Sequence, residues 1–308
     1  MRLIADAVRV SVPATAGNLG PGFDALGMAL GVRDVVEVRA LASSEVIIDI
    51  VGEGETTLAR DESHLVVRAL REALDHAGAS QIGLEIRAKN RIPHGKGLGS
   101  SAAAVVAGIT AARALIAEPE ALDAAVALQI ATAFEGHPDN AAPAIHGGAT
   151  VAWVEADGPH ASPLVLDGRL ETAVLIPESV LPTKEARAVL PPQVPHTHAA
   201  FNVGRAALLV NALAGHPELL LPATEDKLHQ PYRADVMAPA VAMLRHLRDQ
   251  GLAAVVSGAG PSVLVMGLAL AEAGLASGEP GWAQGIGGER WTCVHTVGRV
   301  DGATSKRL

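Results

Sequence analysis

Residues 91–104 read Arg-Ile-Pro-His-Gly-Lys-Gly-Leu-Gly-Ser-Ser-Ala-Ala-Ala, with three glycines at alternate positions directly before two serines. Glycine lets the backbone turn tightly and approach a ligand without a side-chain clash. The small residues that follow predict a helix over 101–116, and a helix N-terminus offers unpaired N–H groups and a partial positive charge. We therefore predict that this segment binds a phosphate group.

An ordinary glycine turn before a serine-capped helix is the competing interpretation of this segment. Lys96 lies among the glycines, and a second glycine loop, Ser-Gly-Ala-Gly-Pro-Ser, stands at residues 257–262. Both features favour phosphate binding. The segment is not a Walker A loop, because Gly97 rather than Ser or Thr follows Lys96. Its glycine spacing does not match the dinucleotide-binding fingerprint either.

Composition narrows the class of protein. The chain has 308 residues, which is enough for a substantial core and two domains. Its net charge of −9 and its aromatic content of 2% argue against a surface that binds nucleic acid. The single cysteine, Cys293, excludes an internal disulfide and a cysteine metal cluster. No signal peptide and no apolar run of about 18 residues is visible, so we expect a soluble cytoplasmic protein without a membrane span.

Hydrophobic periodicity predicts the order of the elements. Strands are expected at 8–12, 35–40, 46–51, 84–88, 147–155, 172–176, 253–256, 263–266 and 294–300, and helices at 64–77, 101–116, 120–135, 184–190, 199–214 and 234–250. A polar loop is expected at 13–24. The elements show no regular βαβ repeat, which favours an α+β fold over a doubly wound sheet. We expect an N-terminal domain at 1–157, a C-terminal domain at 158–308, and a linker within 156–168.

Glu135 is the first candidate for metal binding. It is expected at the C-terminal end of a helix, where the dipole disfavours a carboxylate unless a cation lies beside it. Mg²⁺ prefers such oxygen ligands, and the hydroxyl of Ser100 or Ser101 could supply another. The alternatives are an exposed Glu135 and serines that act only as helix N-caps.

The segment Gly-His-Pro-Asp-Asn at 136–140 places an imidazole, a carboxylate and an amide in one turn. Asp and Asn are also ordinary turn formers, but their position next to Glu135 favours a site.

Elsewhere, the loop at 13–24 offers Asn18 and Asp24, and two guanidiniums are offered by Arg187 and Arg233. Arginine binds carboxylates bidentately, and an acid can bind an ammonium group, so these residues would suit an amino-acid zwitterion.

Taken together, these segments resemble the GHMP small-molecule kinases. That family carries an N-terminal motif, a Pro-x-x-x-Gly-Leu-Gly-Ser-Ser-Ala motif (here 93–102) and a C-terminal glycine loop (here 257–262). Segments 18–24, 135–143 and 183–187 are most similar to the members that phosphorylate L-homoserine, on the way to threonine. The resemblance implies a two-domain α+β fold, with a ribosomal S5 domain 2-like first half and a ferredoxin-like second half. It also implies ATP and Mg²⁺.

The resemblance implies a role for each matching residue. The nucleotide would bind Pro93, His94, Gly95, Lys96, Gly97, Leu98, Gly99, Ser100, Ser101 and Ala102. Mg²⁺ would bind Ser101 and Glu135. L-Homoserine would bind Asn18, Asp24, His137, Thr183, Arg187 and Arg233. Asn140 and His137 would lie at the reacting groups.

Asn140 marks a departure from part of the family. Some relatives have an aspartate general base near this position, whereas an amide has no useful basicity. Catalysis would then depend on positioning and charge stabilisation. Three alternatives remain open: a GHMP kinase for mevalonate, one for a sugar, and a non-catalytic metabolite sensor. A homodimer is expected from the family alone.

Overall fold

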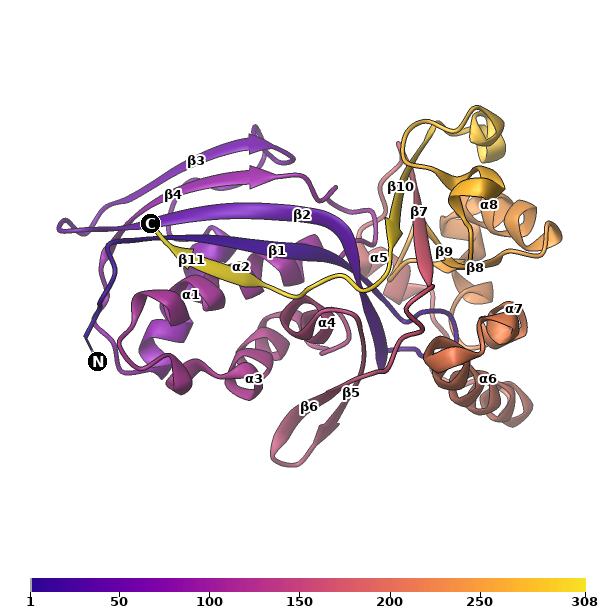
Figure 1. Cartoon of the computed structure of the whole chain (residues 1–308), viewed down its shortest axis with the longest axis horizontal. Coiled ribbons are helices and arrows are strands. Elements are labelled where there is room, and N and C mark those ends of the chain that lie inside the picture. The colour runs from indigo at the N-terminus through magenta and orange to yellow at the C-terminus, as the bar shows by residue number, and fades with distance from the viewer. Residues whose placement is uncertain (1) are drawn as a thin grey trace.

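A computed structural model describes residues 2–308. It contains two sheets with helices packed on them (Figure 1). The first sheet comprises β1 (Ala7–Gly17), β2 (Leu26–Leu41), β3 (Val46–Gly52), β4 (Gly83–Asn90), β5 (Ala149–Glu155), β6 (Gly158–Pro163) and β11 (Thr304–Arg307). The second comprises β7 (Glu171–Pro177), β8 (Ala253–Val256), β9 (Val263–Gly267) and β10 (Trp291–Val297).

The first sheet has the order β11-β1-β2-β4-β3, and the hairpin β5-β6 joins it through β2. Its pairs are antiparallel except for the parallel pair β3-β4. One face carries α1 (Leu65–His76), α2 (Ser100–Leu115), α3 (Ala124–Glu135) and α4 (Ala141–His146) (Figure 1). Val8, Val10 and Val12 alternate along β1 and are buried, as the period of a strand requires.

The small side chains of α2 allow two helices to touch closely. Gly108 lies in the middle of α2, and a Cβ at this position would stand 2.4 Å from the carbonyl oxygen of Val66 in α1. A larger residue at Gly108 would push the two helices apart. The alanine-rich composition of α2 therefore reflects tight packing, which holds its N-terminus in a fixed place.

The second sheet has the antiparallel order β10-β7-β9-β8. Its helices are α5 (Thr183–Ala188), α6 (His196–Gly215), α7 (Leu220–Ala223) and α8 (Ala238–Asp249). Together the two sheets form the α+β, two-domain fold expected from the resemblance. The boundary at 157/158 stays a prediction. Within residues 2–308, no helix combines the length and hydropathy needed to cross a lipid bilayer.

Several predicted bounds are wrong. β1 continues to Gly17 and so includes residues 13–17 of the expected loop at 13–24, because both of its faces become buried and small residues fit there. β6 occupies part of the expected linker at 156–168 as the outer strand of a hairpin. The expected helix 120–135 begins with a separate turn, Pro119–Leu122, and α3 starts after Asp123, whose side chain caps it.

Besides β6, the elements α4, α7 and β11 have no counterpart in the prediction. The short helix α4 follows Asn140 directly. β11 returns to the first sheet and pairs with β1, which lies almost 300 positions earlier in the chain. The strand expected at 294–300 is β10, shifted toward the N-terminus because its partner is β7.

Candidate functional site

Most of the predicted site residues line a cleft of about 100 Å³ between the two halves of the chain. Its walls come from the start of α2, the end of α3, the start of α5 and the second glycine loop. The residues that line it are Asn18, Gly95, Gly97, Leu98, Gly99, Ser100, Ser101, Glu135, His137, Asp139, Asn140, Thr183, Arg187, Arg233, Gly258 and Ala259.

The first glycine loop needs its glycines for conformation and for contact. Gly95, Gly97 and Gly99 have φ values of 65°, 69° and 64°, which side chains disfavour. A Cβ on Gly97 would lie 2.2 Å from the carbonyl oxygen of Ser257. The hydroxyl of Ser257 donates to the Gly97 carbonyl at 2.7 Å. The two glycine loops, about 160 residues apart, therefore form one surface.

The start of α2 lies open to the cleft. Gly99 is its N-cap residue and provides no capping side chain, and Ser100 and Ser101 are the first helical residues. The interpretation of these serines as N-caps is therefore wrong. The first N–H groups of α2 remain available to an anion. This is the geometry that phosphate binding requires.

Ser101 and Glu135 form a pair of oxygen ligands. The Ser101 hydroxyl donates to Glu135 Oε1 at 2.5 Å. Burial raises the pKa of the Glu135 carboxyl. Within residues 2–308, no lysine or arginine forms an ion pair with it. A half-buried carboxylate that pairs with no lysine or arginine of residues 2–308, beside a hydroxyl and an open helix N-terminus, fits a Mg²⁺ ion.

Arg187 lines the cleft and forms a direct ion pair with Asp24, which does not line it. Arg187 donates from Nη2 to Asp24 Oδ1 at 2.7 Å and from Nη1 to Oδ2 at 3.2 Å. About a third of each side chain is exposed, so both remain accessible. The hydrogen bond to Asp24 raises the pKa of Arg187. The charges of these two side chains therefore neutralise each other.

Asn18 and Arg233 have most of their polar atoms occupied by the protein. Asn18 Nδ2 donates to the carbonyl of Gly258 at 2.8 Å, and its Oδ1 accepts from the Asp24 amide at 3.0 Å. Arg233 is 1% exposed and donates from Nε to the Ala186 carbonyl at 3.0 Å. Burial, with the charge of Arg187, lowers the pKa of Arg233 to about 10. Both residues mainly fasten the walls of the cleft.

The turn at 136–140 is held against β1 and β2. The Asp139 carboxylate pairs with His137 Nδ1, and this hydrogen bond raises the pKa of His137. Asp139 lies against Gly17 and Gly27, which face each other in the β1–β2 register. A Cβ on Gly17 would stand 2.2 Å from Asp139 Oδ2, and one on Gly27 would stand 1.8 Å from the Asp139 carbonyl oxygen.

The last predicted residue of this turn, Asn140, has a partner that the sequence analysis missed. The Thr15 hydroxyl donates to Asn140 Oδ1 at 2.9 Å. Thr15 and Gly17 lie at the end of β1, within the segment expected to be a loop. Gly27, the other glycine that contacts Asp139, lies at the start of β2, just after that segment. No local signal relates Thr15 to a residue 125 positions away.

Not every predicted phosphate-binding residue faces the cleft. Lys96 Nζ donates to the Pro177 carbonyl at the end of β7, at 2.7 Å. Pro93, Lys96 and Ala102 line neither the cleft nor the cavity beside it. That second cavity, of about 300 Å³, shares Ser100 and Ser101 with the cleft. It is lined by His94 together with largely apolar side chains such as Leu58 and Val66.

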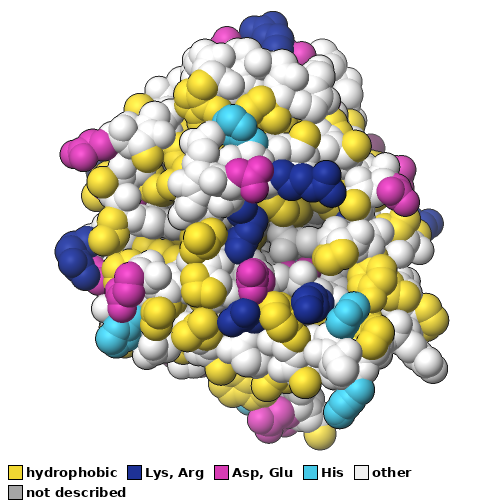
Figure 2. Space-filling model, turned by 90° about the vertical axis from the view of Figure 1, so that its right-hand side faces the viewer, with side chains coloured by type: hydrophobic (Ala, Val, Ile, Leu, Met, Phe, Trp, Pro, Cys, Tyr) yellow, Lys and Arg dark blue, Asp and Glu magenta, His cyan; other side chains and the backbone are white. Residues whose placement is uncertain are grey.

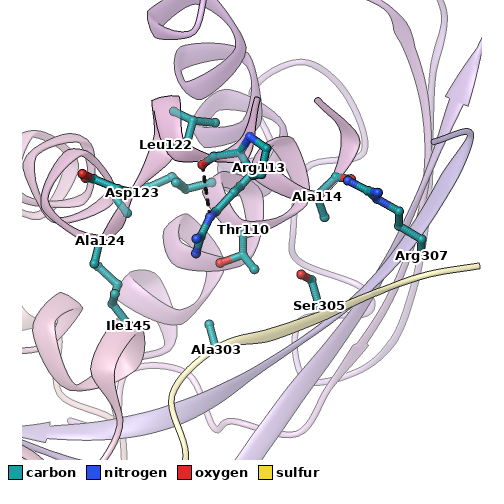
Figure 3. Close-up of a pocket in the computed structure, with 13 residues that line it drawn as sticks. Thr110, Arg113, Ala114, Leu122, Asp123, Ala124, Ile145, Ala303, Ser305 and Arg307 are labelled. Atoms are coloured by element: carbon teal, nitrogen blue, oxygen red, sulfur yellow. Dashed lines mark hydrogen bonds between the residues drawn. The ribbon is translucent and has the colours of Figure 1, made fainter. Parts of the chain in front are cut away.

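Two larger cavities lie away from these residues. One, of about 560 Å³, hollows the face formed by α6, α7 and α8, seen in Figure 2. The other, of about 410 Å³, lies between α2, α3, α4 and β11 (Figure 3). There Arg113 Nε donates to the Pro119 carbonyl and Arg307 Nε to the Ala114 carbonyl. Neither cavity contains a predicted site residue.

Comparison with known proteins gives consistent matches. The sequence profile of the GHMP kinases N terminal domain matches residues 64–148. The chain is 55% identical over 263 residues to a homoserine kinase of Streptomyces coelicolor, covering 85% of each chain. It is 44% identical over 302 residues to a homoserine kinase of a Mycobacterium species, covering 94% of this chain and 96% of the relative.

A solved structure shows the same likeness over the whole fold. The crystal structure of homoserine kinase from Cytophaga hutchinsonii superimposes with a TM-score of 0.85 at 25% sequence identity. The match covers 99% of both chains. The similarity therefore includes both sheets and both glycine loops.

Proposed function

The chain belongs to the homoserine kinases of the GHMP kinase family, and we propose that its reaction takes place in the cleft between the two glycine loops and the turn at 136–140. The reaction transfers the γ-phosphoryl group of ATP to the side-chain hydroxyl of L-homoserine. The products are ADP and O-phospho-L-homoserine, an intermediate of threonine biosynthesis. The identity to homoserine kinases favours this substrate over mevalonate or a sugar.

The observation that carries the placement of ATP is the open N-terminus of α2 behind the glycine loop. Its phosphates would bind the loop amides and the first N–H groups of α2. The nucleoside would occupy the neighbouring cavity of about 300 Å³, which has an apolar lining and shares Ser100 and Ser101 with the cleft. Phosphates and nucleoside would thus lie on opposite sides of these two serines.

Ser101 and Glu135 would hold Mg²⁺ beside the phosphates. When bound there, the ion would supply positive charge that offsets the negative charge developing during transfer. The Ser101–Glu135 hydrogen bond of 2.5 Å already brings the two oxygens together. Glu135 would supply the negative charge that attracts the cation, since the backbone amides that would bind the phosphates carry none.

Asp24 and Arg187 would hold the two charged groups of L-homoserine. In the free protein these side chains neutralise each other. The zwitterion would replace this ion pair, with its ammonium on Asp24 and its carboxylate on Arg187, so that each side chain keeps a partner of opposite charge. Thr183 lines the same wall, while Asn18 and Arg233 hold it in place.

In the transfer step, the substrate hydroxyl oxygen forms a bond to the γ-phosphorus while the bond to the bridging oxygen of ADP breaks. The hydroxyl proton leaves with the phosphoryl group or is passed to solvent. Asn140 and His137 would position the reacting oxygens. Most of the rate enhancement would come from orientation and charge stabilisation.

An ADP-release assay with purified protein tests this function. MgATP is supplied with L-homoserine, L-serine, mevalonate, galactose or no acceptor. We expect ADP release to depend on L-homoserine. ADP release with mevalonate or galactose would instead identify another GHMP kinase. No ADP release with any acceptor, while ATP still binds, would favour the metabolite sensor.

A further inference from the structure

Thr15 lies in the interior of the protein, and its hydroxyl bonds to one side chain of residues 2–308. It belongs to the buried end of β1 and is 0% exposed. Its backbone N–H donates to the Leu98 carbonyl in the glycine loop at 3.0 Å. Its hydroxyl donates to Asn140 Oδ1 at 2.9 Å. A single residue thus connects the phosphate-binding loop with the turn that carries Asn140.

The side-chain amide of Asn140 does not cap the helix that follows it. Asn140 is the N-cap residue of α4, but its side chain makes no capping hydrogen bond. An N-cap asparagine normally uses Oδ1 to accept a hydrogen bond from the first turn of the helix. Here Oδ1 is engaged by Thr15, from another element. The orientation of the amide is therefore set by tertiary structure.

Two glycines enclose this amide on opposite sides. A Cβ on Gly99 would lie 2.0 Å from Thr15 Oγ1 and 3.1 Å from Asn140 Oδ1. A Cβ on Gly17 would lie 2.8 Å from Asn140 Nδ2. Backbone atoms thus press on both ends of the amide, and the space for an alternative rotamer is small. Within residues 2–308, Asn140 Nδ2 makes no hydrogen bond, while Asn140 lines the cleft.

We propose that Thr15 is a positioning residue for catalysis: its hydroxyl holds Asn140 Oδ1, so that Asn140 presents its NH₂ group to the reacting oxygens. This inference rests on the proposed function. A hydroxyl that donates to Oδ1 leaves the NH₂ group to donate a hydrogen bond into the cleft. That hydrogen bond would orient the acceptor hydroxyl or a γ-phosphate oxygen. Asn140 then aligns the reacting groups and does not remove a proton.

The first test compares Thr15→Val with Thr15→Ser. Valine keeps the shape of threonine but has no hydroxyl, and serine keeps the hydroxyl. We expect Thr15→Val to lower kcat about 10- to 100-fold, as a misplaced catalytic group does. The KM values for ATP and L-homoserine should change much less. Thr15→Ser should restore most of kcat. Equal losses in both variants, or a Thr15→Val variant with unchanged kcat, would overturn the proposal.

The direction of the amide is tested by Asn140→Asp, which has no NH₂ group to donate. We expect this variant to lose at least as much kcat as Thr15→Val. Activity close to that of the wild-type protein would mean that an oxygen faces the substrate, which contradicts the assignment.

A measurement without turnover separates this proposal from the proposed function. The side-chain NH₂ signals of Asn140 can be observed by NMR in ¹⁵N-labelled protein and assigned by their loss in Asn140→Asp. In the wild-type protein and Thr15→Ser we expect one sharp pair of signals. Thr15→Val should shift or broaden that pair, whatever acceptor the enzyme uses. An unchanged pair in Thr15→Val would show that Thr15 does not hold the amide.

Discussion

At the scale of single residues, the ion pair of Asp24 and Arg187 would explain how the proposed site selects a zwitterion. Each side chain is about one-third exposed. Each pairs with an opposite charge, and a charged group of the substrate could take the place of that partner. A ligand with only one charge would leave one of the two residues without a partner. Such an unpaired charge in a partly closed site is costly.

Asp24→Asn tests this selection. The variant keeps the size of the side chain but cannot pair with an ammonium group. We expect kcat/KM for L-homoserine to fall about 10- to 100-fold, the usual loss for a hydrogen bond between charged groups. For 4-hydroxybutanoate, which lacks the ammonium group, kcat/KM should change much less. Steady-state kinetics with both acceptors measures this, with Asp249→Asn on the exposed end of α8 as the control. Equal losses would mean that Asp24 does not contact the amine.

Glu135→Gln tests the metal site. Glutamine keeps an oxygen for the Ser101 hydroxyl but removes the charge. We expect kcat to fall about 100-fold and the Mg²⁺ concentration for half-maximal activity to rise, since a carboxylate is a much stronger ligand than an amide. Folding should not suffer, because burial disfavours the charged form.

The matched control is Glu72→Gln on the exposed side of α1. Mn²⁺ binding measured by electron paramagnetic resonance with a bound ATP analogue provides a readout that does not depend on turnover. Unchanged Mn²⁺ affinity in Glu135→Gln would remove this residue from the metal site.

At the scale of elements, the site depends on the contact between two glycine loops. Gly97 meets Ser257 so closely that no side chain fits between them. The Ser257 hydroxyl closes this contact from the other loop. The first loop is therefore fitted closely to the second half of the chain at this point.

Gly97→Ala should break this contact. The added Cβ would clash with the Ser257 carbonyl, and φ of 69° would strain it further. We expect the free energy of unfolding to fall by about 2–4 kcal/mol and the KM for ATP to rise. Urea denaturation and steady-state kinetics measure the two effects.

Gly204→Ala in α6 is the matched control, because a Cβ there meets nothing within 4 Å. Alanine in an exposed helix should raise the free energy of unfolding by about 0.5–1 kcal/mol. Destabilisation of similar size in both variants would contradict the specific role of Gly97.

At the scale of the whole molecule, the last strand ties the end of the chain to its beginning. β11 pairs with β1 over Val8↔Arg307 to Ser11↔Thr304, and so covers the edge of the strand that carries Thr15. Arg307 Nε also donates to the Ala114 carbonyl at the end of α2. This strand therefore contacts both β1, which carries Thr15, and the far end of α2, whose first residues line the cleft.

Deletion of residues 304–308 should therefore weaken the entire fold. We expect the free energy of unfolding to fall by about 2–4 kcal/mol, because several net hydrogen bonds of about 1 kcal/mol each are lost. Urea denaturation checks this, and Lys306→Ala, which keeps the strand, is the control. A truncated protein with unchanged stability would show that β1 does not need this edge partner.

Much of the site could be predicted from local sequence. Glycines at 95, 97 and 99 require a particular backbone, and the small residues behind them specify a tightly packed helix. The end of α3 at Glu135 was marked by Gly136, which has the left-handed φ of 82° typical of a helix C-terminus. The candidate site residues Asn18, Asp24, His137, Asn140 and Arg187 could also be predicted from sequence and resemblance.

The course of β1 and the partners of the polar side chains were decided only by tertiary structure. Residues 13–17 have the composition of a loop, but burial on both faces makes them a strand. Lys96 and Arg233 look like ligand-binding cations, yet backbone carbonyls from distant elements take up their donors. Thr15 and Asn140 are joined across 125 positions. Local sequence determines conformational preference, whereas such contacts depend on long-range packing and on the need to satisfy every buried polar group.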